Sequence, residues 1–219
     1  MKITDKINET KEQINELDTK YMICRKLLKP CSYAELNRCD NCNHNHEKRV
    51  VLSYELQRLN RIEVPTEYID AELSEEIKQL FFENRNIWLF GESGLGKTRA
   101  GYALYIESRI NKIDCSLIVE SEIIKDWERY KDIDILIIDD IGTELNKFRL
   151  ETAYSNYFYL IDYRCKNNKK TVYTSKYNIS AWLSQIAVVN NELSTSIKSR
   201  LSSFFAMKKF EGEDKRIKF

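Results

Sequence analysis

Hydrophobic residues recur every seven positions over the first part of the chain. The positions that share this spacing are Ile7, Ile14, Tyr21 and Leu28, with a companion seam at Ile3, Thr10, Leu17 and Cys24. The heptad spacing predicts one amphipathic helix over residues 2–28, which Pro30 ends. Because the pattern lasts for under four heptads, this helix can pack on its own domain, on a second subunit or on a partner protein.

A second helix is expected from about Glu47 to Asn60. Helical periodicity then fails around Pro65, and a different pattern follows. From residue 66, short apolar runs alternate with helical segments, which is typical of βαβ units and a parallel sheet. We therefore expect an N-terminal helical module over residues 1–62. An α/β domain, with a parallel sheet flanked by helices, is expected over residues 63–219.

The α/β pattern consists of apolar runs of strand length separated by segments of helical periodicity. The expected strands are 86–90, 115–119, 134–138, 171–175 and 204–210. The expected helices are 98–112, 123–130, 147–166 and, in two pieces, 179–203.

Charge and composition exclude several classes of protein. The 219 residues include 35 basic and 34 acidic ones, so a basic surface for nucleic acid would have to be local. No apolar stretch has the length of a membrane span, and the N-terminus is too polar for a secretory signal. We therefore expect a cytoplasmic protein without a membrane partner, whose six cysteines do not form a disulfide framework.

A glycine-rich loop follows the first expected strand. Residues 91–98 read GESGLGKT and fit the phosphate-loop pattern G-x-x-x-x-G-K-[S/T]. The residues expected to bind nucleotide here are Gly91, Glu92, Ser93, Gly94, Leu95, Gly96, Lys97 and Thr98. The backbone N–H groups and the start of the next helix bind phosphate oxygens, Lys97 reaches the β and γ phosphates, and the Thr98 hydroxyl binds Mg²⁺. The motif predicts a P-loop nucleoside triphosphatase.

Paired carboxylates follow the third expected strand. Asp139 and Asp140 end the apolar run ILII, at the edge of the sheet where the phosphate loop also lies. Two adjacent carboxylates at such a place are costly unless a cation or a water molecule uses them. We expect Asp139 to hold Mg²⁺, largely through water, and Asp140 to orient or deprotonate the attacking water.

Four segments in order carry a resemblance to a known family. They are LIIDDIGTE (136–144), FYLIDYRCKNNKKTVYTSKYN (158–178), IKSRL (197–201) and FEGEDKR (210–216). From about Ile62 to Arg216 the chain resembles bacterial replicative helicase loaders, the DnaC and DnaI proteins, and their transposition relative IstB, all AAA+ ATPases. The resemblance implies ATP hydrolysis, a hexameric replicative helicase and single-stranded DNA as partners, and self-association through the ATP interface.

The same resemblance implies roles for further residues. Arg200 looks like the arginine finger that reaches the γ-phosphate on a neighbouring subunit, and Arg216 looks like the arginine that senses nucleotide within its own subunit. Thr174 and Ser175 lie on the strand that carries the polar sensor.

Two positions depart from the family pattern. Lys176 stands where asparagine is usual after the sensor pair, and Asp140 stands where glutamate is usual. Because aspartate is shorter than glutamate, slow hydrolysis or a switch-like role is expected. Both departures leave open a helicase-binding adaptor with low turnover. An IstB-like ATPase that regulates a transposase on DNA is a separate alternative.

Cysteine and histidine gather between the two N-terminal helices. The candidate zinc ligands are Cys31, Cys39, Cys42, His44 and His46. The C-x-x-C spacing of residues 39–42 places two thiolates on one metal, which predicts a closed structural zinc site. The fourth ligand stays open between Cys24, His44 and His46, and free thiols or a redox pair are the alternatives.

Aromatic and basic side chains also alternate in the second half of the chain. They are Tyr157, Tyr159, Tyr163, Arg164, Lys169 and Lys170. Such a set can form a surface that binds single-stranded DNA, or it can be half core and half solvated face.

Overall fold

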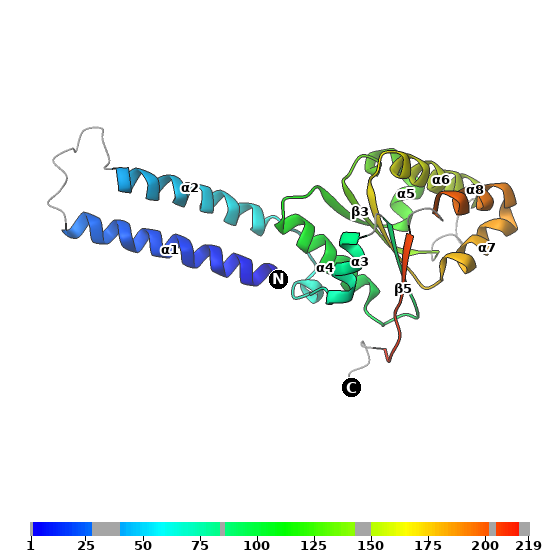
Figure 1. Ribbon diagram of the computed structural model, residues 1–219, viewed down its shortest axis with the longest axis horizontal. Helices are drawn as coiled ribbons and strands as arrows, with labels where there is room; N and C mark the ends of the chain where they lie inside the picture. Colours follow the sequence, from blue (N-terminus) through cyan, green and yellow to red (C-terminus); the bar gives the residue numbers. More distant parts are fainter. Residues whose placement is uncertain (1, 28–39, 84–85, 143–149, 202–204, 215–219) are drawn as a thin grey trace. The chain divides into compact units, whose positions relative to one another are not determined.

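The computed structural model describes residues 2–27, 40–83, 86–142, 150–201 and 205–214 (Figure 1). Its contacts divide the chain into two compact units, Met1–Asp70 and Ala71–Phe219.

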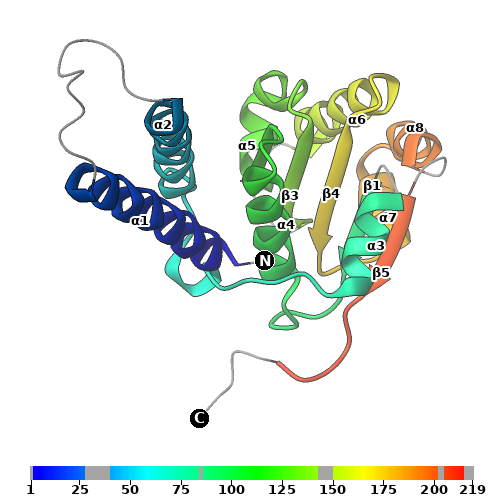
Figure 2. The ribbon, with the colours of Figure 1, turned by 60° about the vertical axis from the view of Figure 1, so that its left-hand side comes forward.

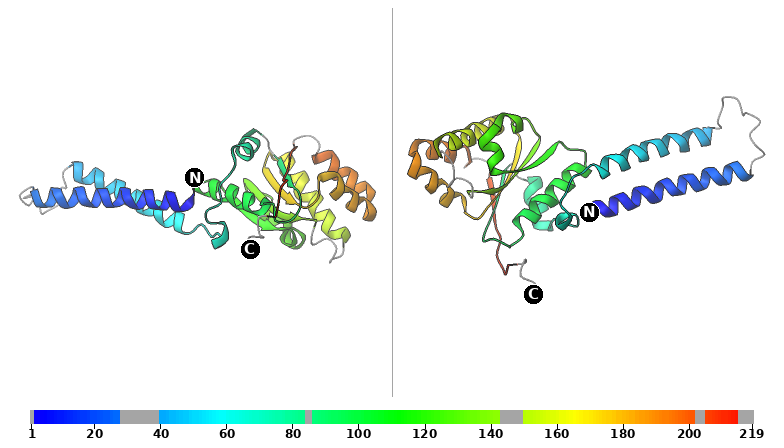
Figure 3. Two further views of the ribbon diagram at one scale, coloured as in Figure 1. Left: turned by 90° about the horizontal axis from the view of Figure 1, so that it is seen from below. Right: turned by 180° about the vertical axis from the view of Figure 1, so that it is seen from behind.

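The N-terminal unit is built on two long helices, α1 (Ile3–Leu27) and α2 (Asp40–Asn60), followed by the short 3-10 helix η1 (Thr66–Tyr68). Both ends of the helix predicted over residues 2–28 agree with α1. The companion seam is buried at Ile3, Thr10 and Leu17, and α1 packs along α2 of the same unit, as the two views of Figure 3 show. Within the described ranges, none of the helices is long and apolar enough to cross a membrane.

The second helix begins earlier than the sequence pattern predicts. It starts at Asp40, whereas Glu47 was the expected first residue. The reason is that aspartate and asparagine side chains favour the first turn of a helix, where they meet unpaired backbone N–H groups and the positive end of the helix dipole. A polar run without hydrophobic periodicity can therefore still be helical.

The second unit contains a sheet of five strands in the order β2-β3-β4-β1-β5. The strands are β1 (Asn86–Phe90), β2 (Cys115–Val119), β3 (Ile135–Ile141), β4 (Lys170–Ser175) and β5 (Phe205–Lys209). Every neighbouring pair is parallel, and Figure 2 shows β3 and β4 side by side. The predicted parallel α/β fold is confirmed.

Helices cover both faces of this sheet. The first face carries α3 (Glu75–Glu83) and α4 (Lys97–Ile110). The second face carries α5 (Glu120–Asp126), α6 (Leu150–Lys166), α7 (Ile179–Val189) and α8 (Asn191–Leu201), with the 3-10 helix η2 (Trp127–Tyr130) after α5. Bulky strand residues fill each interface, with Trp88 and Tyr173 facing α7 and α6 while Leu89 and Val172 face α4.

The connections after β1 and β4 leave the sheet on opposite sides. These strands are neighbours, but the chain after β1 enters α4 on one face and the chain after β4 enters α7 on the other. Such a switch opens a crevice at the carboxyl ends of the two strands, which is where open parallel sheets bind ligands.

Candidate nucleotide-binding site

The glycine-rich loop joins β1 to α4 at this crevice. Gly91 approaches the chain after β5 so closely that an added Cβ would lie 2.4 Å from the Phe210 carbonyl oxygen. Gly96 caps α4 with a φ of 96°, in the left-handed region that favours glycine. The loop therefore turns directly into the helix, and the first N–H groups of α4 face the crevice as an anion site.

Lys97 lies inside the loop. Its side chain is buried, and its Nζ donates to the carbonyl oxygens of Gly91 at 2.8 Å and Glu92 at 2.7 Å. Glu92 and Ser93 are exposed at the tip, while Leu95 is buried. The ammonium group is thus held at the centre of the loop, where phosphate oxygens would meet it.

The first acid of β3 lies directly beside the loop. The Thr98 hydroxyl donates to Asp139 Oδ1 at 3.2 Å, and the Thr174 hydroxyl donates to the same oxygen. Burial raises the pKa of Asp139 above its usual range, the neighbouring Asp140 raises it further, and the two hydroxyls and Lys97 oppose that rise.

These contacts give the features of a magnesium site. A carboxylate and a hydroxyl are hard oxygen ligands, and a cation would relieve the cost of burying the charge of Asp139. Mg²⁺ is usually held by one or two carboxylates together with substrate phosphates. Among the described residues, no group of three or more histidine, cysteine or acidic side chains could hold a metal.

The second acid of β3 sits in a β-bulge. Register between β3 and β4 shifts between Ile138 and Ile141, and Asp140 has a φ of 57°, a conformation that aspartate tolerates better than most residues. Its backbone N–H donates to the Thr174 hydroxyl at 2.9 Å, where a strand would use a carbonyl. The bulge turns Asp139 inward and leaves Asp140 exposed at the crevice.

The two predicted sensor residues both point into the protein. Thr174 bridges the two acids as described, and the Ser175 hydroxyl donates to the Ile141 carbonyl at 2.7 Å and accepts the Tyr177 N–H at 3.0 Å. Both side chains are fully buried. Lys176, the next residue, points outward and forms an ion pair with Glu92, with 3.6 Å between Nζ and Oε2.

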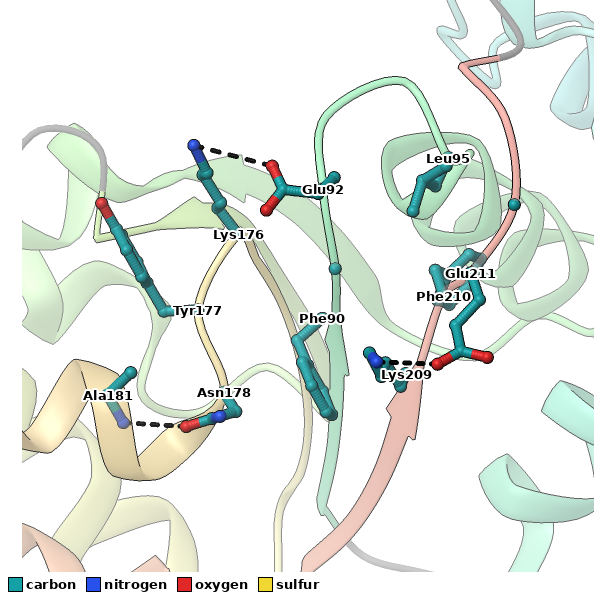
Figure 4. A pocket seen from close by; sticks show the side chains of 12 residues that line it. Phe90, Glu92, Leu95, Lys176, Tyr177, Asn178, Ala181, Lys209, Phe210 and Glu211 are labelled. Carbon is teal, nitrogen blue, oxygen red and sulfur yellow. Dashed lines mark hydrogen bonds and ion pairs between the residues drawn. The ribbon is translucent and has the colours of Figure 1, made fainter.

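A pocket of about 410 Å³ lies at the same edge, between the ends of β1, β4 and β5 (Figure 4). Phe90, Tyr177 and Phe210 contribute aromatic walls, and the Lys176–Glu92 pair lies at one side. The chain after β5 continues along the phosphate loop, since an added Cβ on Gly94 would meet the carboxylate of Asp214.

The two predicted arginines are not brought to this site by the described residues. Arg200 Nε donates to Asp162 Oδ1 of α6 at 2.7 Å, and its guanidinium lies 5.8 Å from the centre of the Phe158 ring. Arg200 comes shortly before β5, whose start pairs with the start of β1. It therefore lies at the amino ends of the strands, whereas the phosphate loop lies at their carboxyl ends. Arg216 lies outside the described residues.

The zinc prediction also falls outside what the structure describes. Cys31 and Cys39 are beyond the described ranges. Cys42, His44 and His46 belong to the first turns of α2, but their side chains are not described. The zinc site stays a prediction from sequence.

The aromatic and basic set fits the second of its two alternatives, half core and half solvated face. Tyr157 and Arg164 are buried because this stripe of α6 faces the sheet. Arg164 donates to Thr171 Oγ1 and to the backbone carbonyls of Tyr130, Lys131, Ile133 and Lys170. Burial lowers the pKa of Arg164 to about 10. The hydrogen bonds of Arg164 therefore link the segment before β3 to the start of β4.

The other four members of that set have contacts of their own. Tyr159 is exposed and stacks on Trp127. Tyr163 donates to Asp132, Lys169 pairs with Asp134, and Lys170 donates to the Phe81 carbonyl.

One buried acid near the site was missed by the sequence reasoning. Glu120, the first residue of α5, accepts the Gly142 N–H at 2.9 Å and the Tyr157 hydroxyl at 2.7 Å. It fixes the backbone two residues after Asp140. A glutamate directly after an apolar strand, next to the strand of the paired acids, is the pattern that could have revealed it.

Comparison with known proteins gives matches of sequence family and of structure. A family profile described as RNA helicase matches residues 87–181, less than half of the chain. No curated protein matches the sequence. The crystal structure of DnaI has a TM-score of 0.56 at 16% identity, covering 70% of this chain and 94% of that one.

Two further solved structures are similar. The DnaC helicase loader gives a TM-score of 0.51 at 18% identity, covering 67% of this chain and all (100%) of that one. AMPPCP-bound DnaA from Aquifex aeolicus gives 0.50 at 16% identity, covering 65% of this chain and 47% of that one. At such identities the likeness establishes the fold. The chain therefore shares the parallel α/β fold of these proteins, and its resemblance to DnaC- and DnaI-type helicase loaders is confirmed at the level of the fold.

Proposed function

We propose that this protein is an ATP-dependent helicase loader. It binds a hexameric replicative DNA helicase and helps to place it on single-stranded DNA when replication starts. The observation that carries this proposal is the meeting of Lys97, Thr98, Asp139 and Asp140 at the switch-point crevice, in a fold shared with DnaI and the DnaC helicase loader.

The chain's own residues divide the work of ATP hydrolysis. The loop N–H groups and Lys97 bind and orient the phosphates, and Thr98 and Asp139 hold Mg²⁺. When bound, Mg²⁺ neutralises charge on the phosphate oxygens. Asp140, exposed beside them, orients or deprotonates the attacking water. Its side chain is shorter than glutamate, so turnover is slow.

Self-association completes the site. Arg200 lies at the amino ends of the strands, away from its own phosphate loop at their carboxyl ends. This place suits an arginine finger that acts on the nucleotide of a neighbouring subunit. Arg216 would sense the nucleotide within its own subunit. ATP binding would favour the assembly, and hydrolysis would release it.

The N-terminal module, residues 1–62, would hold the helicase, and residues 63–219 would form the ATPase. Zinc bound by Cys31, Cys39, Cys42 and one of Cys24, His44 or His46 would stabilise this module. Mass spectrometry of the native protein should find one zinc per chain, both in the wild type and in Lys97→Ala. An absence of zinc in the wild type would contradict this part of the proposal.

Affinity capture with ATP present tests the function as a whole. Wild-type protein should recover a hexameric replicative helicase, and Lys97→Ala, which cannot hold the phosphates, should lose its nucleotide dependence. Recovery of a transposase in place of a helicase would favour an IstB-like regulator. Helicase recovered without any hydrolysis of ATP, even with single-stranded DNA added, would favour an adaptor.

A further inference from the structure

The side chain of Arg200 is held against α6. Its Nε donates to Asp162 Oδ1 at 2.7 Å, and its guanidinium lies 5.8 Å from the centre of the Phe158 ring. Phe158 and Asp162 are four residues apart, so they share one face of α6, and α6 packs beside α8 (Figure 1). The Cys165 thiol also donates weakly to the Arg200 carbonyl oxygen, with 3.9 Å between sulfur and oxygen. Helix α6 therefore fixes both the backbone and the side chain of this arginine.

This attachment uses one end of the guanidinium group. Arginine carries five N–H donors in a planar fork, and Asp162 takes the one on Nε. Within the part of the chain that the structure describes, no hydrogen bond or ion pair engages the two Nη groups of Arg200. The side chain is 39% exposed. The Nη pair can therefore meet the oxygens of an anion from outside the subunit, such as a phosphate group.

Asp162 is itself a firm anchor. Its second carboxylate oxygen, Oδ2, accepts from Lys166 Nζ at 2.7 Å, and its side chain is only 17% exposed. Burial raises the pKa of this carboxyl, but the hydrogen bonds from Lys166 and Arg200 outweigh burial and bring the pKa below its ordinary value. Asp162 is therefore ionised at neutral pH, with one cationic partner for each oxygen.

We propose that Asp162 is a positioning residue for Arg200. It fixes the arginine through Nε and so presents the Nη groups to the terminal phosphate of a nucleoside triphosphate bound by a neighbouring copy of this chain. This inference rests on the proposed function, in which Arg200 acts on the nucleotide of another subunit. A long side chain loses rotamer freedom when it engages the transition state, and the Asp162 contact removes part of that freedom beforehand. Asp162 itself does not touch the nucleotide.

Substitution of Asp162 should change the rate of hydrolysis and not the binding of nucleotide. In the assembled full-length protein, Asp162→Ala should lower kcat for ATP hydrolysis by about five- to tenfold, the range between an exposed ion pair and a buried charged hydrogen bond. KM and the affinity for Mg·ATP should change by less than about twofold, because only the transition state loses an interaction. Asp162→Glu, which keeps a carboxylate, should recover part of the rate.

Two controls separate positioning from a general loss of stability. Asp134→Ala removes an acid from another ion pair, with Lys169 at 2.7 Å, and should leave kcat unchanged. In a protein that already carries Arg200→Ala, the further change Asp162→Ala should have no additional effect on kcat, because the role of Asp162 depends on that arginine. A structural role would lower the rate in both backgrounds alike.

Mixed assemblies test whether the effect passes between subunits. Lys97→Ala chains cannot hold the phosphates but carry an intact Arg200. Adding them to Asp162→Ala chains should therefore raise hydrolysis per nucleotide-binding chain. Chains that carry both Lys97→Ala and Arg200→Ala should give no such rescue.

Steady-state hydrolysis and calorimetric titration measure all of these effects. Wild-type protein that does not hydrolyse Mg·ATP would overturn the proposed function itself. If wild-type protein hydrolyses ATP, the inference about Asp162 alone would be overturned by an Asp162→Ala chain whose kcat is unchanged or raised, or whose affinity for Mg·ATP falls together with its rate. A lower kcat at unchanged affinity, which Lys97→Ala chains rescue, would support it.

Discussion

Replacing Thr174 by valine removes a hydroxyl from the centre of the site while almost preserving the shape of the side chain. This hydroxyl donates to the Asp139 carboxylate and accepts the Asp140 N–H at 2.9 Å. A buried hydrogen bond to a charged group contributes about 1.5–3 kcal/mol, and a neutral one contributes about 1 kcal/mol. Thr174→Val should therefore lower the free energy of unfolding by about 2.5–4 kcal/mol.

The effect should depend on pH in a defined direction. The Thr174 hydroxyl lowers the pKa of Asp139 against the larger effect of burial, so its loss raises that pKa further. The destabilisation should be largest where Asp139 is ionised and should shrink as the pH falls through the pKa of Asp139.

Two measurements test this prediction. Urea unfolding of the full chain gives the change in stability, and Thr174→Ser, which keeps the hydroxyl, should lose only about 1 kcal/mol with its methyl group. Hydrogen exchange gives a local measure, because the Asp140 amide loses its acceptor and its protection in Thr174→Val. The reasoning would be refuted if valine and serine were equally stable, or if the Asp140 amide stayed protected.

Three other predictions concern charged groups. Burial raises the pKa of Asp139 above the ordinary value of 3.8, so its ionisation costs stability as the pH rises through the raised pKa. Asp139→Asn should therefore be more stable than wild type at neutral pH but equally stable or less stable below pH 3.8, while hydrolysis falls by more than about a hundredfold. Arg164→Met leaves four buried or partly buried carbonyls without this donor and should cost about 3–5 kcal/mol in urea unfolding. If Arg164→Met lost no more stability than Lys169→Ala, which removes only an exposed ion pair, the stabilising role of the Arg164 hydrogen bonds would be contradicted. Arg200→Ala should leave Mg·ATP binding intact and reduce hydrolysis by the assembled protein by about a thousandfold. Unchanged hydrolysis would contradict the role of Arg200 as the arginine finger.

The sheet was predictable in content, but its strand order was not. Apolar runs such as residues 86–90 and 115–119 are long enough for strands and are bounded by polar turns, so each appeared where expected. Strand order depends on pairing between segments far apart in the chain. Nothing local places β4 between β3 and β1, yet this order creates the crevice.

The site was predictable where one short motif fixes the geometry. The phosphate loop and the two acids near the end of β3 lie together because parallel strands bring their carboxyl ends to one edge, and Thr98 contacts Asp139 as that argument requires. The bulge at Asp140 was not predictable, since it arises from the fit of β3 against β4 and from the Thr174 hydroxyl.

Buried polar residues were the other feature that the sequence did not determine. Arg164 lies in an aromatic-rich helix, and arginine is a residue type that is usually exposed. Here, however, carbonyls from two other segments converge on its guanidinium. Glu120 is buried for a similar reason, because the Gly142 N–H and the Tyr157 hydroxyl come from distant elements. A sequence pattern does not reveal acceptors and donors that only the fold assembles.

Calorimetric titration with ATP, with and without Mg²⁺, tests most directly whether the crevice is a nucleoside triphosphate site. We predict that the full-length wild-type protein binds one ATP per chain in the presence of Mg²⁺ and binds it more weakly without the metal. The Lys97→Ala variant should show no saturable binding. Wild-type protein that gives no heat of binding at millimolar Mg·ATP, or Lys97→Ala that binds as tightly as wild type, would contradict the account.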